Sequence, residues 1–243
     1  MQKIFNAKNI MRFIFLTFIA SIAFIIVRIV LAPVAAPPSD ITIRVKSDYM
    51  LMLLESILGA IAMLLPGFLQ RKAKLDIPNA MLIAYAVFLY CAIYLGEVRE
   101  FYYRIPYWDT VLHAFSGIAI GALGFSVISL LNKSESVAVS LSPIFVAVFA
   151  FCFALALGVI WEIYEFTMDS ILKINMQKYA LESGELLIGQ AALLDTMKDL
   201  IVDAMGAFTV SVIGYISLKN NKGWLDRFQV KKLRDNDSRG EPE

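Results

Sequence analysis

The chain has 243 residues, of which 59% are hydrophobic and 18% are charged, and its mean hydropathy is +0.68. This balance is too apolar for a soluble domain of this length, so the composition predicts membrane spans. The formal net charge of +1 argues against nucleic acid as a partner. Cys91 and Cys152 both fall within apolar runs, which favours buried thiols over a disulfide framework or a metal site.

Six apolar segments are each close to the ~20 residues that cross a bilayer core, at residues 13–31, 49–69, 79–96, 109–131, 137–161 and 200–218. We therefore expect an all-α, polytopic bundle of six transmembrane helices. Residues 1–12 form a cytoplasmic arm, and the polar residues 219–243 are expected to be a disordered tail. The first segment contains Arg28 and precedes "APVAAPPS", which is similar to a signal-peptidase site. We favour an uncleaved anchor because the apolar run continues past Arg28.

Basic residues in the loops predict the orientation of the bundle. Fourteen lie on the side of the two termini: Lys3, Lys8, Arg12, Arg71, Lys72, Lys74, Lys133, Lys219, Lys222, Arg227, Lys231, Lys232, Arg234 and Arg239. Seven lie on the opposite side: Arg44, Lys46, Arg99, Arg104, Lys173, Lys178 and Lys198. The positive-inside rule then places both termini in the cytoplasm.

The fourth segment opens with "YWDTVLHAFSG", in which Asp109 and His113 are four residues apart and so share one helical face with Ser116. His113 is the only histidine of the chain. An Asp–His hydrogen bond that locks the helix would explain the pair, but a histidine within a membrane helix is also a functional candidate. Small residues, Gly117, Gly121 and Gly124, follow as a stripe where a neighbouring helix can approach closely.

Acidic residues also line one face of each of the next two segments. Glu162, Glu165 and Asp169 end the fifth segment within "GVIWEIYEFTMDS". In "LLDTMKDLIVDAMGAF", which leads into the sixth, the aspartates are spaced four apart: Asp195, Asp199 and Asp203. Like charges at that spacing repel one another, so these helices need a compensating partner.

The predicted topology brings these side chains to one boundary of the membrane, the outer one, together with Glu55 of the second segment. Clustered carboxylates must be protonated, paired with cations or bound to a metal. Arg99 and Arg104 lie on the same side and are candidate partners. One histidine with several carboxylates otherwise suits Mg²⁺, Mn²⁺ or Zn²⁺.

Three motifs carry a resemblance: "YWDTVLHAFSG", "GVIWEIYEF" and "DTMKDLIVDAMGA". In this order they resemble the uncharacterised bacterial inner-membrane proteins of the YjdF type, over segments two to six. The Asp109–His113 and Asp199–Asp203–Gly206 patterns are also similar to the two signatures of the VanZ-like membrane proteins, although those usually have Asn at the position of Asp203. The resemblance implies a polytopic membrane protein and, through the VanZ-like motifs, a connection with the cell envelope.

Three functions remain open from the sequence. The first is an intramembrane, metal-dependent hydrolase or transferase acting on a lipid or lipid-linked envelope substrate, with Asp109, His113, Glu162 and Asp199 as ligands and Glu165 or Asp203 as base. In that hypothesis, residues 166–195 cover the site. The second is a proton- or cation-coupled transporter. The third is a non-catalytic envelope factor whose acidic cluster is structural.

Overall fold

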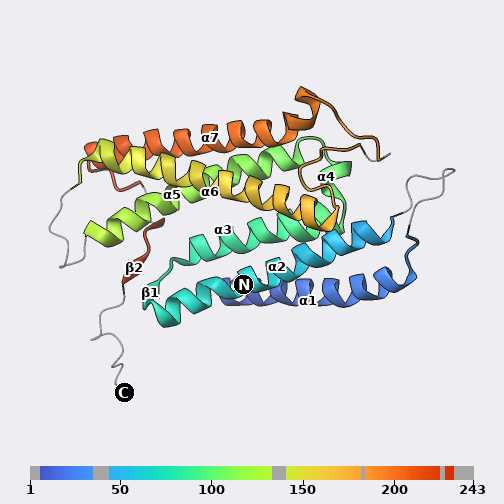
Figure 1. Cartoon of the computed structure of the whole chain (residues 1–243). Coiled ribbons are helices and arrows are strands. Elements are labelled where there is room, and N and C mark those ends of the chain that lie inside the picture. The colour runs from blue at the N-terminus through green and yellow to red at the C-terminus, as the bar shows by residue number, and fades with distance from the viewer. Residues whose placement is uncertain (1–5, 35–43, 133–140, 182–183, 225–227, 233–243) are drawn as a thin grey trace, which may run out of the picture.

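The computed structural model describes residues 6–34, 44–132, 141–181, 184–224 and 228–232 (Figure 1). Over these residues the chain is almost entirely helical. Its helices are α1 (Ala7–Leu31), α2 (Lys46–Lys72), α3 (Asn79–Leu89), the π-helix η1 (Tyr90–Val98), α4 (Phe101–Arg104), α5 (Trp108–Asn132), α6 (Pro143–Leu172) and α7 (Gln190–Lys219). Two short strands, β1 (Leu75–Asp76) and β2 (Lys231–Lys232), pair antiparallel. The prediction of an all-α bundle is confirmed.

Six helices of the described chain are long and apolar enough to cross a membrane, with α3 and η1 together forming the third. Large apolar side chains such as Phe13, Leu16, Phe24 and Ile61 are exposed on them, as expected for helices that face lipid. The protein is therefore a multi-pass membrane protein. Both cysteines are free thiols, but the expectation that they are buried is wrong, because Cys91 is half-buried and Cys152 lies on the exposed face of its helix.

Two predicted spans differ most from the structure in their ends, while the first helix begins at Ala7 and not at Phe13. The fifth is an unbroken helix to Leu172 and not to Trp161, and Lys173 ends it in a left-handed conformation. The sixth begins at Gln190 and not at Leu200, directly after Gly189 with its positive φ of 65°. Both differences have the same cause. The prediction ended each span where polar residues begin, but polar residues that pack inside a bundle continue the helix. The predicted start of the fifth span at Val137 lies outside the described residues, whereas the described helix begins with Ser142 as N-cap and Pro143 as its first residue.

The helices form two groups, with α1, α2 and α3 in one and α5, α6 and α7 in the other (Figure 1). In the second group, the glycines of the predicted stripe allow close packing. A Cβ atom at Gly117 would collide with the backbone of Asp203 on α7, and one at Gly124 would lie 2.9 Å from the Cα atom of Ala150 on α6. These contacts set α5 firmly against both of its neighbours.

The two groups meet at the end of the bundle that carries α4, hereafter the α4 end. Leu51 of α2 packs there against Ile174 and Met176, which follow α6. The indole Nε1 of Trp108 donates to the carbonyl of Cys91 at 3.2 Å. The third span is wound as a π-helix where it reaches this end, a distortion that often accompanies functional sites.

Strands β1 and β2 lie at the opposite end of the bundle (Figure 1). In the C-terminal tail, where composition predicts disorder, the amide of buried Val230 donates to Ser126 Oγ at 2.7 Å and Lys231–Lys232 form β2. Residues 233–243 of that tail, residues 1–5 of the arm, and residues 35–39 of the segment similar to a cleavage site lie outside the described part of the chain.

Candidate metal centre

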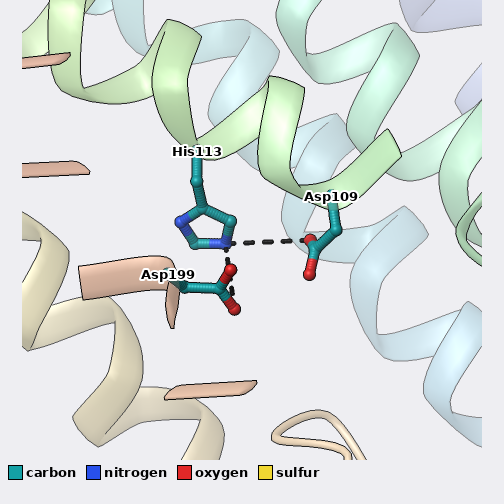
Figure 2. A group of neighbouring side chains, drawn as sticks. All are labelled: Asp109, His113 and Asp199. Atoms are coloured by element: carbon teal, nitrogen blue, oxygen red, sulfur yellow. Dashed lines mark ion pairs between the residues drawn. The ribbon is translucent and has the colours of Figure 1, made fainter. Parts of the chain in front are cut away.

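Asp109, His113 and Asp199 point toward one another across the interface of α5 and α7 (Figure 2). His113 Nε2 lies 3.7 Å from Asp109 Oδ1 and 3.8 Å from Asp199 Oδ2. Each residue offers one ligand atom, and the three atoms all lie within 4.8 Å of one another. The four-residue spacing on α5 thus brings Asp109 and His113 together, as predicted.

The separations of these three atoms are close to what a divalent cation requires. Metal–ligand bonds of about 2.1 Å place neighbouring ligand atoms about 3.0–3.4 Å apart. The two distances from His113 Nε2, 3.7 and 3.8 Å, exceed this range by only a few tenths of an ångström. Asp199 is only 3% exposed, and its Oδ1 atom has no hydrogen-bond partner among the described residues. A buried carboxylate oxygen without a partner is costly, and a cation would satisfy it.

Asp203 and Ser116 fix the orientation of the His113 ring. His113 Nδ1 lies 3.2 Å from Asp203 Oδ2, and Ser116 Oγ donates to Asp203 Oδ1 at 2.7 Å. Because a carboxylate only accepts hydrogen bonds, Nδ1 carries the proton. The lone pair of a neutral His113 is then on Nε2, which faces Asp109 and Asp199. At metal sites, the ring nitrogen of a histidine ligand that does not bind the metal usually donates its proton to a carboxylate, a backbone carbonyl or a water.

Lys178 brings the nearest cation, from the loop that follows α6. Its Nζ atom lies 3.0 Å from Asp109 Oδ2 and 3.6 Å from Asp195 Oδ2, and 5.3 Å from the centre of the Tyr102 ring. Burial lowers the pKa of Lys178, but Asp109 and Asp195 outweigh burial, and the pKa lies above its usual value. Lys178 therefore places a positive charge beside Asp109, His113 and Asp199, hereafter the metal-ligand group, a candidate set of ligands.

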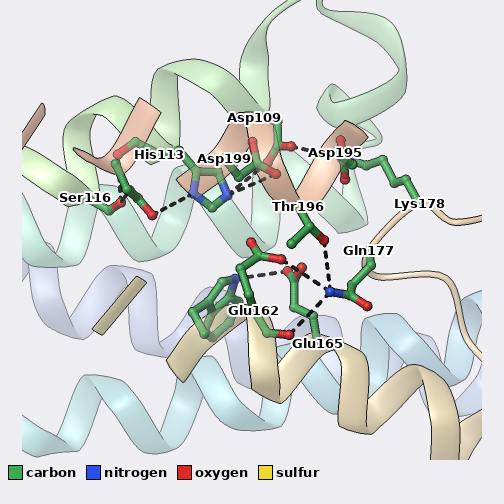
Figure 3. Close-up of polar contacts among 12 residues, drawn as sticks. Asp109, His113, Ser116, Glu162, Glu165, Gln177, Lys178, Asp195, Thr196 and Asp199 are labelled. Atoms are coloured by element: carbon green, nitrogen blue, oxygen red, sulfur yellow. Dashed lines mark hydrogen bonds and ion pairs between the residues drawn. The ribbon is translucent and has the colours of Figure 1, made fainter. Parts of the chain in front are cut away.

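A second polar network joins α6, α7 and the loop between them (Figure 3). Gln177 Nε2 donates to Glu162 Oε2 at 3.4 Å and to Thr196 Oγ1 at 2.9 Å. Asp169 accepts the backbone amides of Met176 and Gln177 at 2.7 and 3.0 Å. This network holds the loop that carries Lys178 against the two helices.

A cavity of about 360 Å³ lies between the two groups of helices and reaches the metal-ligand group. Polar and charged side chains line it at the α4 end: Glu55, Glu97, Tyr102, Asp109, His113, Ser116, Trp161, Glu165, Asn175, Lys178, Asp195, Asp199 and Asp203. Trp161 Nε1 donates to Glu165 Oε1 at 2.9 Å. Burial, with Glu55 and Asp109 nearby, raises the pKa of Tyr102, so its hydroxyl stays protonated.

Further along each helix, away from the α4 end, the cavity wall becomes apolar. The lining residues there are Leu58 and Ala62 of α2, Phe88 and Leu89 of α3, Ile120 of α5 and Leu157 of α6. The cavity is thus polar at one end and hydrocarbon-like at the other. This division matches a molecule with a polar head and an apolar chain.

Comparison with known proteins places the chain in a family. Residues 14–220 match the model of a family described as predicted membrane protein, DUF2238. The chain belongs to the DUF2238 family. It is also 28% identical over 167 residues to an uncharacterised protein of Thermotoga maritima, covering 67% of this chain and 76% of the relative. No solved structure matches the chain.

Every residue of the metal-ligand group and its surroundings lies within the range that matches DUF2238. Of the four predicted ligands, Asp109, His113 and Asp199 converge, whereas Glu162 binds Gln177 instead. Of the two predicted bases, Glu165 lines the cavity and Asp203 holds His113. The other predicted site residues divide: Glu55 and Asp195 line the cavity, Asp169 caps the loop, and Arg99 and Arg104 lie outside the lining.

The sequence reasoning did not identify Lys178, Gln177, Glu97 or Tyr102 as site residues. Lys178 and Gln177 lie in a loop without hydrophobic periodicity, so no pattern indicates where their side chains point. Glu97 lies near the end of the third span, within "GEVRE". Its acidic charge at the α4 end was the one feature of the sequence that could have identified it as a lining residue of the cavity.

Proposed function

We propose that this DUF2238 protein is an intramembrane, metal-dependent hydrolase or transferase that acts on a lipid or lipid-linked substrate of the cell envelope. One observation carries the proposal. His113 Nε2 and the carboxylates of Asp109 and Asp199 converge at the polar end of a cavity whose other end is apolar. In a membrane protein, a cavity of this kind suits an amphipathic substrate.

The residues have distinct roles in this proposal. Asp109, His113 and Asp199 hold a divalent cation, and Asp203 keeps the imidazole in the orientation that directs Nε2 to it. When bound, the cation supplies Lewis-acid activation of a phosphoryl or acyl oxygen and of an attacking water. Glu165 is the better candidate for general base, because both carboxylate oxygens of Asp203 are already engaged.

Lys178 has two possible effects on the same site. Its ammonium group can stabilise negative charge that develops on a substrate at the polar end of the cavity. It also pairs with Asp109 and Asp195 without any metal, and this observation favours the second candidate, a non-catalytic envelope factor with a structural acidic cluster. A proton- or cation-coupled transporter has less support, since the deeper lining of the cavity, among described residues, is apolar.

The cellular setting of the proposal is a bacterial inner membrane, with the metal centre facing the outer side. The excess of basic residues on the side of the termini supports that orientation. The resemblance of the Asp109–His113 and Asp199–Asp203–Gly206 patterns to the VanZ-like signatures supports an envelope role.

The direct test is metal analysis of detergent-purified protein, followed by titration of the metal-free protein with Zn²⁺, Mn²⁺ and Mg²⁺. We expect close to one equivalent of a divalent metal in the wild type and a loss of binding in His113→Ala and Asp199→Asn. Asp76→Asn is the matched control, because exposed Asp76 lies in β1 at the opposite end of the bundle. It should bind metal like the wild type.

Two results would contradict the proposal. Absence of specific binding for all three metals in the wild type would leave the structural role of the cluster as the better reading. Equal binding in wild type, His113→Ala and Asp199→Asn would place any bound metal elsewhere. Thermal unfolding of each variant in detergent separates loss of the site from loss of the fold.

A further inference from the structure

A second groove, of about 1010 Å³, lies at the α4 end and shares no lining residue with the first cavity. Its walls come from α1, the segments that flank it, the start of α2, the end of η1, and α4. The groove is therefore built without any residue of α5, α6 or α7, away from the metal-ligand group.

The groove is strongly cationic at one end. Four arginines line it, Arg28, Arg44, Arg99 and Arg104, against a single carboxylate, Glu100. Glu100 is already shared, since Arg44 Nη2 lies 2.5 Å from its Oε1 and Arg104 pairs with its Oε2. One carboxylate cannot neutralise four guanidinium groups, so the groove keeps a net positive charge among its described residues.

Two of the arginines have donors left for a ligand. Arg28 Nε and Nη2 donate to the Tyr49 hydroxyl, an uncharged partner, at 3.0 and 2.8 Å, and no carboxylate of the described residues pairs with Arg28. Arg99 is exposed, and its side chain makes no hydrogen bond or ion pair with the part of the chain that the structure describes. A guanidinium group binds phosphate oxygens well because its planar donors match their geometry.

From the arginines, the groove continues along an apolar face of α1. Phe24, Ala20, Leu16 and Phe13 line it at helical spacing. Thr17 and Ser21 lie beside them, and their hydroxyls donate to backbone carbonyls of α1 itself. From Arg28 to Phe13 the helix rises ~22 Å at 1.5 Å per residue, more than the ~15 Å depth of one leaflet's hydrocarbon. An acyl chain can lie on this face, whereas a free phosphate or a soluble nucleotide would leave it unused.

We propose that this groove binds an anionic phospholipid, with its phosphate between Arg28 and Arg99 and an acyl chain along the Phe13–Phe24 face of α1. A lipid with net negative charge is the occupant that fits both ends. It compensates the cationic end, and its chain covers exposed apolar side chains. The binding is independent of the proposed metal chemistry, since no residue is shared with that cavity.

The test uses full-length protein in detergent and native mass spectrometry with phosphatidylglycerol and phosphatidylethanolamine of identical acyl chains. The wild type should retain phosphatidylglycerol selectively. Arg28→Gln and Arg99→Gln should each weaken that binding by roughly tenfold, the size of one charge-assisted hydrogen bond. Arg71→Gln, which removes the same charge at the far end of α2, should have no effect. Excess glycerol 3-phosphate should not displace the lipid, because it has no acyl chain.

Three outcomes overturn the proposal. Equal retention of the two lipids by the wild type would show that the arginines do not select an anionic headgroup. Equal weakening in Arg71→Gln would mean that net charge alone decides binding. Displacement by glycerol 3-phosphate would identify a site for soluble phosphate compounds. If Arg28→Gln fails to fold, Arg99→Gln still tests the proposal. Arg99 is exposed, and its side chain makes no hydrogen bond or ion pair with the described residues, so its replacement should leave the fold intact.

Discussion

Asp203 Oδ2 lies 3.2 Å from His113 Nδ1, although the two residues are 90 positions apart in the sequence and belong to different helices. This contact decides which way the only histidine faces. With Nδ1 donating to Asp203, Nε2 is directed at Asp109 and Asp199. The metal-ligand group therefore depends on a residue that would not itself touch the metal.

Asp203→Asn is expected to weaken metal binding by roughly 10- to 100-fold, the usual cost of losing the partner behind a histidine ligand. An amide accepts only at its oxygen, so it cannot receive hydrogen bonds from His113 and Ser116 on two separate atoms as the carboxylate does. Metal titration of the purified variant measures the effect, with Asp76→Asn as control. Wild-type affinity in Asp203→Asn would show that His113 is oriented by other contacts.

Two glycines that touch Asp203 are expected to behave differently when replaced by alanine. A Cβ atom at Gly158 would lie 2.8 Å from Asp203 Oδ2, so the carboxylate must move and metal affinity should fall several-fold with little change in stability. A Cβ atom at Gly117 would meet the backbone of Asp203 instead, so Gly117→Ala should destabilise the fold by about 1–3 kcal/mol. Thermal unfolding and metal titration of both variants test this contrast. A similar loss of stability in the two would contradict it.

Periodicity and topology predict much of this site from the sequence. The four-residue spacing of Asp109 and His113 predicts their shared face, and six spans with acids at one boundary predict that α7 contributes Asp199 to the same place. The ends of the helices were less predictable from the sequence. Asp195 and Asp199 lie inside α7, but polar residues just before an apolar run suggest a segment that precedes the helix.

Other features depend on packing that sequence spacing does not encode. The role of Asp203 follows from contacts with Ser116, His113 and Gly158, which come from two other helices. Arg99 and Arg104 carry the expected charge at the expected end of the bundle. Arg104, however, pairs with Glu100, while Lys178 reaches the metal-ligand group from a loop.

Lys178→Gln is expected to bind divalent metal more tightly than the wild type. The ammonium group lies 3.0 Å from Asp109 Oδ2, where it repels an incoming cation and occupies one of the ligand residues. Without metal, the same variant should unfold at a lower temperature, because Asp109 and Asp195 lose their shared partner. Weaker metal binding in Lys178→Gln would mean that Lys178 supports the metal centre and does not compete with it.

The contribution of Lys178 to stability should not vary between pH 6 and pH 9. Its pKa in the folded protein is above the ordinary value, so its stabilising effect is fully present below about pH 10.4 and is lost only as the pH rises through the folded pKa. The difference in unfolding temperature between the wild type and Lys178→Gln should therefore be constant across that range. A difference that shrinks on raising the pH from 6 to 9 would contradict the shifted pKa.

The orientation of the bundle decides which compartment would supply the proposed substrate. The two-to-one excess of basic residues on the side of the termini predicts that the loop between α6 and α7, which carries Lys178, faces outward. In a chain with Cys91 and Cys152 replaced by serine, exposed Glu185 in that loop and exposed Asp76 in β1 give a matched pair of reporters. Glu185→Cys should react with a membrane-impermeant maleimide added to intact cells, and Asp76→Cys only after permeabilisation. The reverse labelling pattern would show that the candidate metal centre faces the cytoplasm. The proposed substrate would then come from the inner leaflet.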